Sequence, residues 1–313
     1  MRIGIVGFGA IGGLMATALA PHAEVHVFAR GPRGMHAMAE GLVLEGLLEQ
    51  RLQPADVTVH LPELDHPAPS GLDVVLLAVK AHQVEAAMER ALPSLVNEGV
   101  VAYLGNGLGV VESLQRNHPG RVVAVTCTHG AMVGEGARTR WTGHGSLMLG
   151  SWPSGPVTPA MMALEALLKR ANLNPVCVEN ARSHVWRKAL LNIAINPVCA
   201  LAGVENGIML ERHDLLESGL ELMREAMDVG HALGIEQPSP VEAATDVIDV
   251  LTATATNRCS MLEDVRRGRR TEIDALNGAV VDLGEEAGVP TPRNAQITAL
   301  VRAVDADHSR SAL

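Results

Sequence analysis

The stretch Ile3-Gly-Ile-Val-Gly-Phe-Gly-Ala-Ile-Gly12 decides the fold of the N-terminal half of the chain. Its first four residues are typical of a short buried strand, and the small apolar residues from Gly13 to Leu19 are typical of a helix packed on a sheet. The Gly-x-Gly-x-x-Gly loop between them allows a tight turn, close approach to a pyrophosphate and close helix–strand packing. The stretch therefore predicts a dinucleotide-binding loop, and the alternative is that the glycines serve only the turn. The predicted cofactor-binding residues of the loop are Gly7, Phe8, Gly9, Ala10, Ile11 and Gly12.

The next strand, Glu24–Phe28, ends just before Arg30. An NAD-binding unit usually places an acidic residue here for the ribose hydroxyl, whereas an arginine suits the 2′-phosphate of NADP. We therefore expect NADPH rather than NADH, with Arg30 as the selecting residue and Arg33 as a second phosphate ligand. The alternative is that Arg30 is a solvated surface charge.

The alternation of strands and helices continues to about residue 180. Strands are predicted at Leu42–Leu44, Val57–Leu61, Asp73–Val79, Val100–Leu104, Arg121–Thr126 and Pro175–Val178. Lys80 and Asn106 follow two of these strands, and ligands of such sheets bind beyond the carboxyl ends of the strands. The alternatives are that Lys80 is a solvated lysine and that Asn106 belongs to a turn-forming Asn-Gly pair.

From Ala181 onward the apolar spacing is helical. Helices are predicted over Val185–Leu201, Leu215–Leu233, Pro240–Val265 and Thr271–Ala287. The predicted fold is an α/β Rossmann-type N-terminal domain, residues 1–180, followed by an all-α C-terminal domain, residues 181–313.

Polar residues interrupt the apolar pattern of the second half at regular spacing. Lys188, Asn192 and Asn196 lie four residues apart and so share one helix face, which must find hydrogen bonds or meet solvent. Asn257 and Ser260 are predicted on one face of a later helix, and Glu272 follows them. Four arginines lie between Ser260 and Glu272 and are expected to form a solvated face that pairs with Glu263 and Asp264. They are Arg266, Arg267, Arg269 and Arg270.

Composition excludes several classes of function. The net charge of −10 and an aromatic content of 2% disfavour nucleic acid as a partner. The 4 cysteines form no CxxC pair and the 13 histidines no HExxH motif, so neither a metal site nor a disulfide framework is expected, and the cytoplasm is the expected compartment. No apolar stretch is long enough for a membrane span, and the glycines between Arg2 and Ala20 argue against a signal peptide.

These residues together give a specific resemblance. The sequence resembles the ketopantoate reductases (2-dehydropantoate 2-reductases) from residue 3 to about 278. The motifs that carry it are Gly7–Gly12, Val79-Lys-Ala-His-Gln83, Asn106-Gly-Leu-Gly109, Trp186-Arg-Lys-Ala-Leu-Leu-Asn192, Ile195-Asn-Pro197, Asn206-Gly207, Ser260-Met-Leu-Glu-Asp264 and Thr271-Glu-Ile-Asp274.

The resemblance implies an NADPH-dependent oxidoreductase of pantothenate and coenzyme A biosynthesis, with its active site between the two domains. Lys188 would be the general acid, and Glu272 would contact both cofactor and substrate. The implied substrate-binding residues are Asn106, Asn192, Asn196, Asn206, Asn257 and Ser260, and the implied cofactor-binding residues beyond the loop are Arg30, Lys80, Asn106, Ala131 and Glu272. The helical domain leaves room for a homodimer interface.

Two positions depart from the family pattern. Gly105 stands where a polar residue often precedes Asn-Gly, and Cys259 stands where a serine is common. The alternatives are therefore a related reductase of another 2-keto acid and, from a different class, a non-catalytic NADPH-binding sensor. A sensor has no need of an acid such as Lys188.

Overall fold

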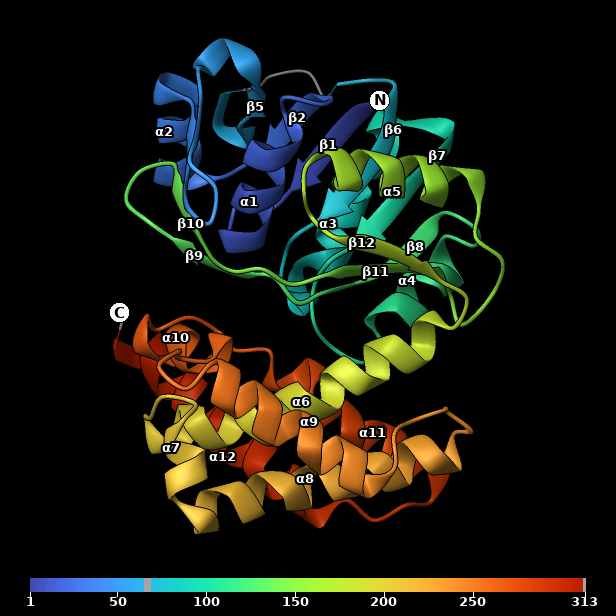
Figure 1. Cartoon of the computed structure of the whole chain (residues 1–313), viewed down its shortest axis with the longest axis vertical. Coiled ribbons are helices and arrows are strands. Elements are labelled where there is room, and N and C mark those ends of the chain that lie inside the picture. Colours follow the sequence, from blue (N-terminus) through green and yellow to red (C-terminus); the bar gives the residue numbers. More distant parts are fainter. Residues whose placement is uncertain (65–68, 312–313) are drawn as a thin grey trace. The chain divides into compact units, whose positions relative to one another are not determined.

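The computed structural model describes residues 1–64 and 69–311 (Figure 1). The chain packs into two compact units. The first contains Met1–Gly105 and Val110–Ala181, and the second contains Asn106–Gly109 and Arg182–Leu313. Each unit has an apolar core of its own.

The first unit is built on an eight-stranded sheet in the order β12-β11-β8-β7-β6-β1-β2-β5. Neighbouring strands are parallel except for the antiparallel pair β8 and β11. The strands are β1 (Arg2–Val6), β2 (Glu24–Phe28), β5 (Thr58–His60), β6 (Leu72–Leu77), β7 (Leu95–Tyr103), β8 (Val122–Cys127), β11 (Leu147–Ser151) and β12 (Pro175–Val178). The buried apolar runs of the sequence form most of these strands, as a parallel sheet covered on both faces requires.

The strand order reverses between β1 and β6. From β1 the chain builds outward through β2 and β5, then returns to β6 and builds through β7 and β8 on the other side. Val6 is in register with Leu77, so the chain leaves both strands at the same edge of the sheet. Such a switch point is where open α/β sheets bind ligands.

Helices and a second sheet surround these strands. The helices are α1 (Ala10–Leu19), α2 (Gly31–Glu40), α3 (Val84–Ala91), α4 (Val110–Asn117) and α5 (Pro159–Arg170). The second sheet has the order β4-β3-β10-β9 and consists of β3 (Leu42–Gly46), β4 (Gln50–Leu52), β9 (Gly130–Val133) and β10 (Arg138–Gly143). Its strands β3, β9 and β10 pack on α1, which is buried from Gly12 to Leu19.

The second unit is helical, and its described part contains no strand. Its helices are α6 (Ala181–Ala202), α7 (Ile208–Glu211), α8 (His213–Ala232), α9 (Pro240–Ala253), α10 (Ser260–Arg266), α11 (Asn277–Ala287) and α12 (Pro292–Ser311). The predicted fold class, an α/β domain followed by an all-α domain, is therefore confirmed.

Two predicted helices are wrong in extent. The helix predicted over Pro240–Val265 is divided, because the backbone N–H groups of Asn206 and Gly207 donate to the carbonyls of Asn257 and Ala255, each at 2.9 Å, and hold this segment as a loop. The helix predicted from Thr271 begins only at Asn277. Here Thr271 donates through its N–H and its hydroxyl to Asp305 of α12, at 3.1 and 2.8 Å, which ties the segment down outside a helix.

Candidate functional site

The glycine loop has the geometry of a dinucleotide cradle. Gly7 has φ +99°, which a side chain rarely adopts, and a Cβ there would lie 2.6 Å from the carbonyl oxygen of Ala78. A Cβ on Gly12 would lie 1.8 Å from the carbonyl oxygen of Gly7, so only glycine allows α1 to start this close to the turn. A Cβ on Gly9 would meet nothing within 4 Å. The two outer glycines are thus required by packing, while the middle one leaves an open backbone surface that fits a pyrophosphate.

The other predicted cofactor residues of the first unit lie at strand ends or on the second sheet. Arg30 is the exposed N-cap residue of α2, and no residue in the described part of the chain accepts a hydrogen bond from its guanidinium. Lys80 is half-buried and follows β6 at the switch point. Ala131 lies in β9, opposite Trp141 of β10.

Arg33 does not stand ready for a phosphate, contrary to its expected role beside Arg30. Its guanidinium donates hydrogen bonds to the carbonyls of Phe8, Gly136 and Arg138 and to the hydroxyl of Thr139. Burial lowers the pKa of Arg33 to about 10, which leaves it charged at neutral pH. Nothing in the local sequence indicates this, because three of the four acceptors are more than 100 residues away along the chain.

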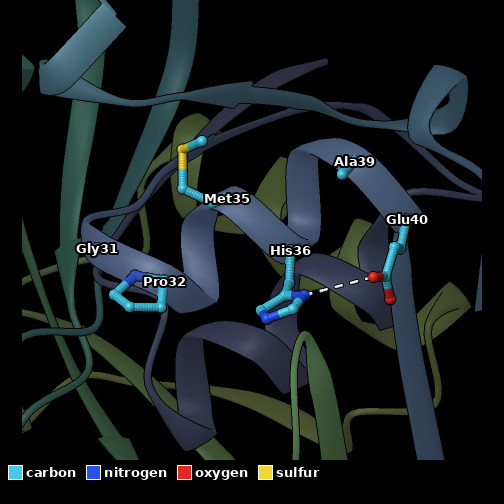
Figure 2. A pocket seen from close by; sticks show the side chains of 6 residues that line it. All are labelled: Gly31, Pro32, Met35, His36, Ala39 and Glu40. Atoms are coloured by element: carbon cyan, nitrogen blue, oxygen red, sulfur yellow. Dashed lines mark hydrogen bonds and ion pairs between the residues drawn. The ribbon is translucent and has the colours of Figure 1, made fainter.

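The outer face of α2 carries a hollow (Figure 2). Its first lining residue, Gly31, directly follows Arg30 in the sequence. Its lining residues are Gly31, Pro32, Met35, His36, Ala39 and Glu40, and His36 and Glu40 are in contact across one helical turn at 3.4 Å. None of the predicted site residues lines it.

The polar row of the second unit lies on one continuous helix, α6, as predicted. Lys188 and Asn192 are half-buried, and Asn196 is 5% exposed, so the row does not simply face solvent. The side-chain amide of Asn196 is not among the buried side-chain atoms of the described residues that lack a hydrogen-bond partner. Polar side chains among apolar neighbours need hydrogen-bond partners, which a polar ligand can supply.

Asn106 and Glu272 meet in the same unit. The Asn106 side-chain amide donates to the Glu272 carboxylate at 3.1 Å, and the nearby backbone N–H of Leu108 donates to the carbonyl of Ala275 at 2.7 Å. The segment Asn106–Gly109 therefore packs with the helical unit although its neighbours in sequence belong to the α/β unit. The structure thus brings Lys188, the two α6 amides, Asn106 and Glu272 into one unit.

Asn206 has a mainly structural environment. Its side-chain N–H donates to the Thr254 hydroxyl at 2.9 Å, and its backbone N–H donates to the Asn257 carbonyl. Its side-chain oxygen is buried and has no hydrogen-bond partner in the described part of the chain. Asn206 therefore holds the loop that carries Asn257, and only its oxygen remains for another donor.

Asn257 and Ser260 are exposed, and the predicted common helix face is wrong for this pair. Asn257 lies in the loop, and α10 begins only at Ser260. The arginines that follow pair with the acidic residues as predicted, since Arg267 contacts Glu263 and Arg269 contacts Asp264, each at 3.0 Å.

Comparison with known proteins identifies the family. Residues 3–154 match the family model described as ketopantoate reductase PanE/ApbA, and residues 180–305 match its C-terminal model. The chain belongs to the ketopantoate reductase family. It is 30% identical over 304 residues to a 2-dehydropantoate 2-reductase of Archaeoglobus fulgidus, covering 97% of this chain and 98% of that protein. It is 31% identical over 305 residues to the protein of the same name from Pyrococcus horikoshii, covering 97% of each.

Solved structures agree with this membership. A PanE/ApbA family ketopantoate reductase from Ralstonia eutropha JMP134 superimposes with a TM-score of 0.88 at 26% identity, covering 99% of this chain and 100% of that one. A D-mandelate dehydrogenase bound to NADH and anilino(oxo)acetate superimposes with a TM-score of 0.90 at 22% identity, covering 99% of both chains. The second likeness shows a shared fold, so the ketopantoate reductase fold is compatible with more than one substrate.

Residues 1–64 and 69–311 of this ketopantoate reductase family member contain neither a metal-binding cluster nor a membrane-spanning helix. No group of three or more His, Cys, Asp or Glu side chains there could hold a metal ion. No helix there combines the length and the apolar character that a membrane span requires.

Proposed function

We propose that this chain reduces 2-dehydropantoate (ketopantoate) to pantoate with NADPH, in the cytoplasmic synthesis of pantothenate and coenzyme A. The observation that carries the proposal is the polar row of α6, in which half-buried Lys188 precedes the half-buried and buried amides of Asn192 and Asn196. A cation and two amides in apolar surroundings suit a ligand that carries a carbonyl and a carboxylate. Family membership narrows that ligand to a 2-keto acid.

The roles of the two units follow from their chemistry. Gly7–Gly12 would hold the pyrophosphate, Arg30 the 2′-phosphate, and Lys80 and Ala131 other parts of the nucleotide. A reduced nicotinamide, when bound, would supply the hydride for the keto carbon of the substrate. The residues of the second unit would bind and orient the keto acid, and Ser260 and Asn257 would contact its carboxylate and hydroxyl end. Asn206 would support the loop that carries Asn257.

Lys188 would complete the reaction by proton transfer. Its ammonium group donates a proton to the ketone oxygen as that oxygen gains negative charge, and the product is a 2-hydroxy acid. The carboxylate of Glu272, fixed by Asn106 at 3.1 Å, is suited to keep a neighbouring ammonium charged and oriented. The proposed proton transfer therefore requires both Lys188 and Glu272.

A second candidate is a related reductase of another 2-keto acid. The observation that favours it is Cys259, which replaces the serine common in the family and is 7% exposed directly beside Ser260. Under this alternative Lys188 and Glu272 keep their roles, and only the residues that shape the substrate pocket differ.

The deciding experiment measures NADPH oxidation by the purified protein with ketopantoate, pyruvate, oxaloacetate and branched 2-keto acids. The proposal expects the highest kcat/KM with ketopantoate. Higher kcat/KM with another acid would select the second candidate, and nucleotide binding without turnover of any of these acids would indicate a sensor.

A further inference from the structure

Arg33 connects the glycine loop to the second sheet of the first unit. Its Nε donates to the carbonyl of Phe8, inside the loop, at 2.9 Å. Its Nη1 donates to the carbonyls of Gly136 and Arg138 at 3.0 and 2.7 Å, and its Nη2 donates to the Thr139 hydroxyl at 2.7 Å. A guanidinium has five N–H groups in a rigid planar fork, so four of the five are committed to protein acceptors.

The packing around these bonds is close. The Arg33 guanidinium carbon lies 4.6 Å from the centre of the Phe8 ring, which adds a cation–π contact to the same loop residue. A Cβ on Gly13, in the first turn of α1, would lie 2.2 Å from the Thr139 hydroxyl and 3.1 Å from Arg33 Nη2. Loop, helix and β10 therefore meet at one point, with Arg33 as the charged donor in the middle.

We infer that Arg33 is a positioning residue, which holds the glycine loop in its nucleotide-binding conformation and does not select the 2′-phosphate. Phe8 lies between two glycines, so without the anchor its carbonyl would be free to rotate with a permissive backbone. Fixing it in advance lowers the ordering cost when a pyrophosphate binds. The inference rests on the proposed nucleotide binding by this loop.

Arg33 and Arg30 should therefore differ in their effect on the binding of the two nucleotides. NADPH and NADH share the pyrophosphate and differ at the 2′-phosphate, so an anchor of the loop should affect both nucleotides equally. A ligand of the 2′-phosphate should affect NADPH alone.

The test measures Kd for NADPH and for NADH by calorimetry in the full-length protein and in four variants. Arg33→Lys keeps the charge but cannot form the planar fork of hydrogen bonds. Thr139→Val removes only one acceptor of Arg33, and it serves as the test if Arg33→Lys folds poorly. Arg30→Gln removes the selecting residue, and Arg140→Lys changes an exposed arginine of the same strand, β10, as the matched control.

We expect Arg33→Lys to raise both Kd values by about tenfold while their ratio changes by less than about twofold, which is the effect of roughly one lost charge-assisted hydrogen bond. Thr139→Val should raise both Kd values as well, but by a smaller factor. In both variants KM for NADPH should rise, while kcat at saturating NADPH is retained. Arg30→Gln should change the ratio, and Arg140→Lys should change neither value. A changed ratio in Arg33→Lys, or unchanged Kd values for both nucleotides, would overturn the inference.

Hydrogen exchange of the nucleotide-free protein tests the anchor independently of binding. The amides of Gly7–Gly12 should exchange about tenfold faster in Arg33→Lys than in the parent or Arg140→Lys, because the loop opens more often. Equal exchange rates would overturn the anchoring. Failure of the parent protein to bind either nucleotide would instead refute the proposed function, while the exchange result would still decide whether Arg33 fixes the loop.

Discussion

Asn106 and Glu272 are 166 residues apart in sequence, and the side-chain amide of Asn106 donates a hydrogen bond to the carboxylate of Glu272 at 3.1 Å. The bond joins the side-chain nitrogen of Asn106 to one carboxylate oxygen of Glu272. It also fixes the direction of a half-buried carboxylate in the unit that carries Lys188. Two residues expected to contact both cofactor and substrate thus orient each other.

The first prediction concerns this pair. Asn106→Ala and Glu272→Ala should each lower kcat/KM by roughly ten- to a hundred-fold, because each removes one side of the charge-assisted hydrogen bond that orients the carboxylate. The double variant should lose less than the product of the two effects, since the second change removes a bond already broken. Steady-state kinetics of the four proteins give the coupling. Glu286→Ala, an exposed carboxylate of α11, is the control and should combine additively with Asn106→Ala. Additivity in the Asn106–Glu272 cycle would show that the bond has no catalytic consequence.

The second prediction concerns the proposed acid. Lys188→Ala should lower kcat by about two to four decades while nucleotide binding is retained, as the loss of a general acid does. Arg187→Ala is a matched control on the same helix, because Arg187 is exposed and pairs with Asp246 at 2.8 Å on the surface. It should retain the rate and lose at most about 1 kcal/mol of the free energy of unfolding. Full activity of Lys188→Ala would remove the lysine from the mechanism.

Local sequence is sufficient to place some of these residues but not others. Lys188, Asn192 and Asn196 could be placed on one face because helical spacing is a local property, and the glycine loop could be placed because its turn needs particular residues. The loop between α9 and α10 could not be predicted in this way. It forms because the backbone N–H groups of Asn206 and Gly207, in a distant segment, donate hydrogen bonds to the carbonyls of Asn257 and Ala255. The hydrogen bonds of Arg33 could not be predicted for the same reason. Tertiary hydrogen bonds overrode local preference in each case.

The third prediction concerns Cys259, the departure from the family pattern. Its thiol accepts a hydrogen bond from the N–H of Leu262 at 3.4 Å and donates to the carbonyl of Asn196 at 3.6 Å, so it caps α10 and contacts the polar row of α6. Cys259→Ala should lower the free energy of unfolding by about 1 kcal/mol, the usual cost of a lost N-cap. Cys259→Ser should stay within about 0.5 kcal/mol of the parent, because serine is a preferred cap. Urea denaturation measures both. An alanine variant as stable as the parent would show that the thiol does not stabilise the helix end.

The last prediction concerns the pH dependence of stability and rests on His129. The ring is buried, its Nε2 donates to the carbonyl of Leu173 at 2.9 Å, and its Nδ1 accepts from the N–H of Gly145 at 3.0 Å. The neutral ring therefore satisfies both partners, whereas a second proton on Nδ1 would face the Gly145 N–H. Burial is the main cause that lowers the pKa of His129, and the charge of His144 acts in the same direction.

Neutral His129 stabilises the folded protein more at high pH than at low pH. In the window below the unfolded pKa of about 6.5, the unfolded chain binds a proton that the folded chain resists, so the stability contributed by neutral His129 is present above that pH. It is lost as the pH falls toward the lowered folded pKa, at no more than about 1.4 kcal/mol per pH unit. In thermal unfolding between about pH 7.5 and pH 5, His129→Gln should therefore lose less stability than the parent, by roughly 1 kcal/mol. His22→Gln, at an exposed histidine, should follow the parent profile. Parallel profiles for the parent and His129→Gln would mean that Gly145 and Leu173 accommodate the charged ring.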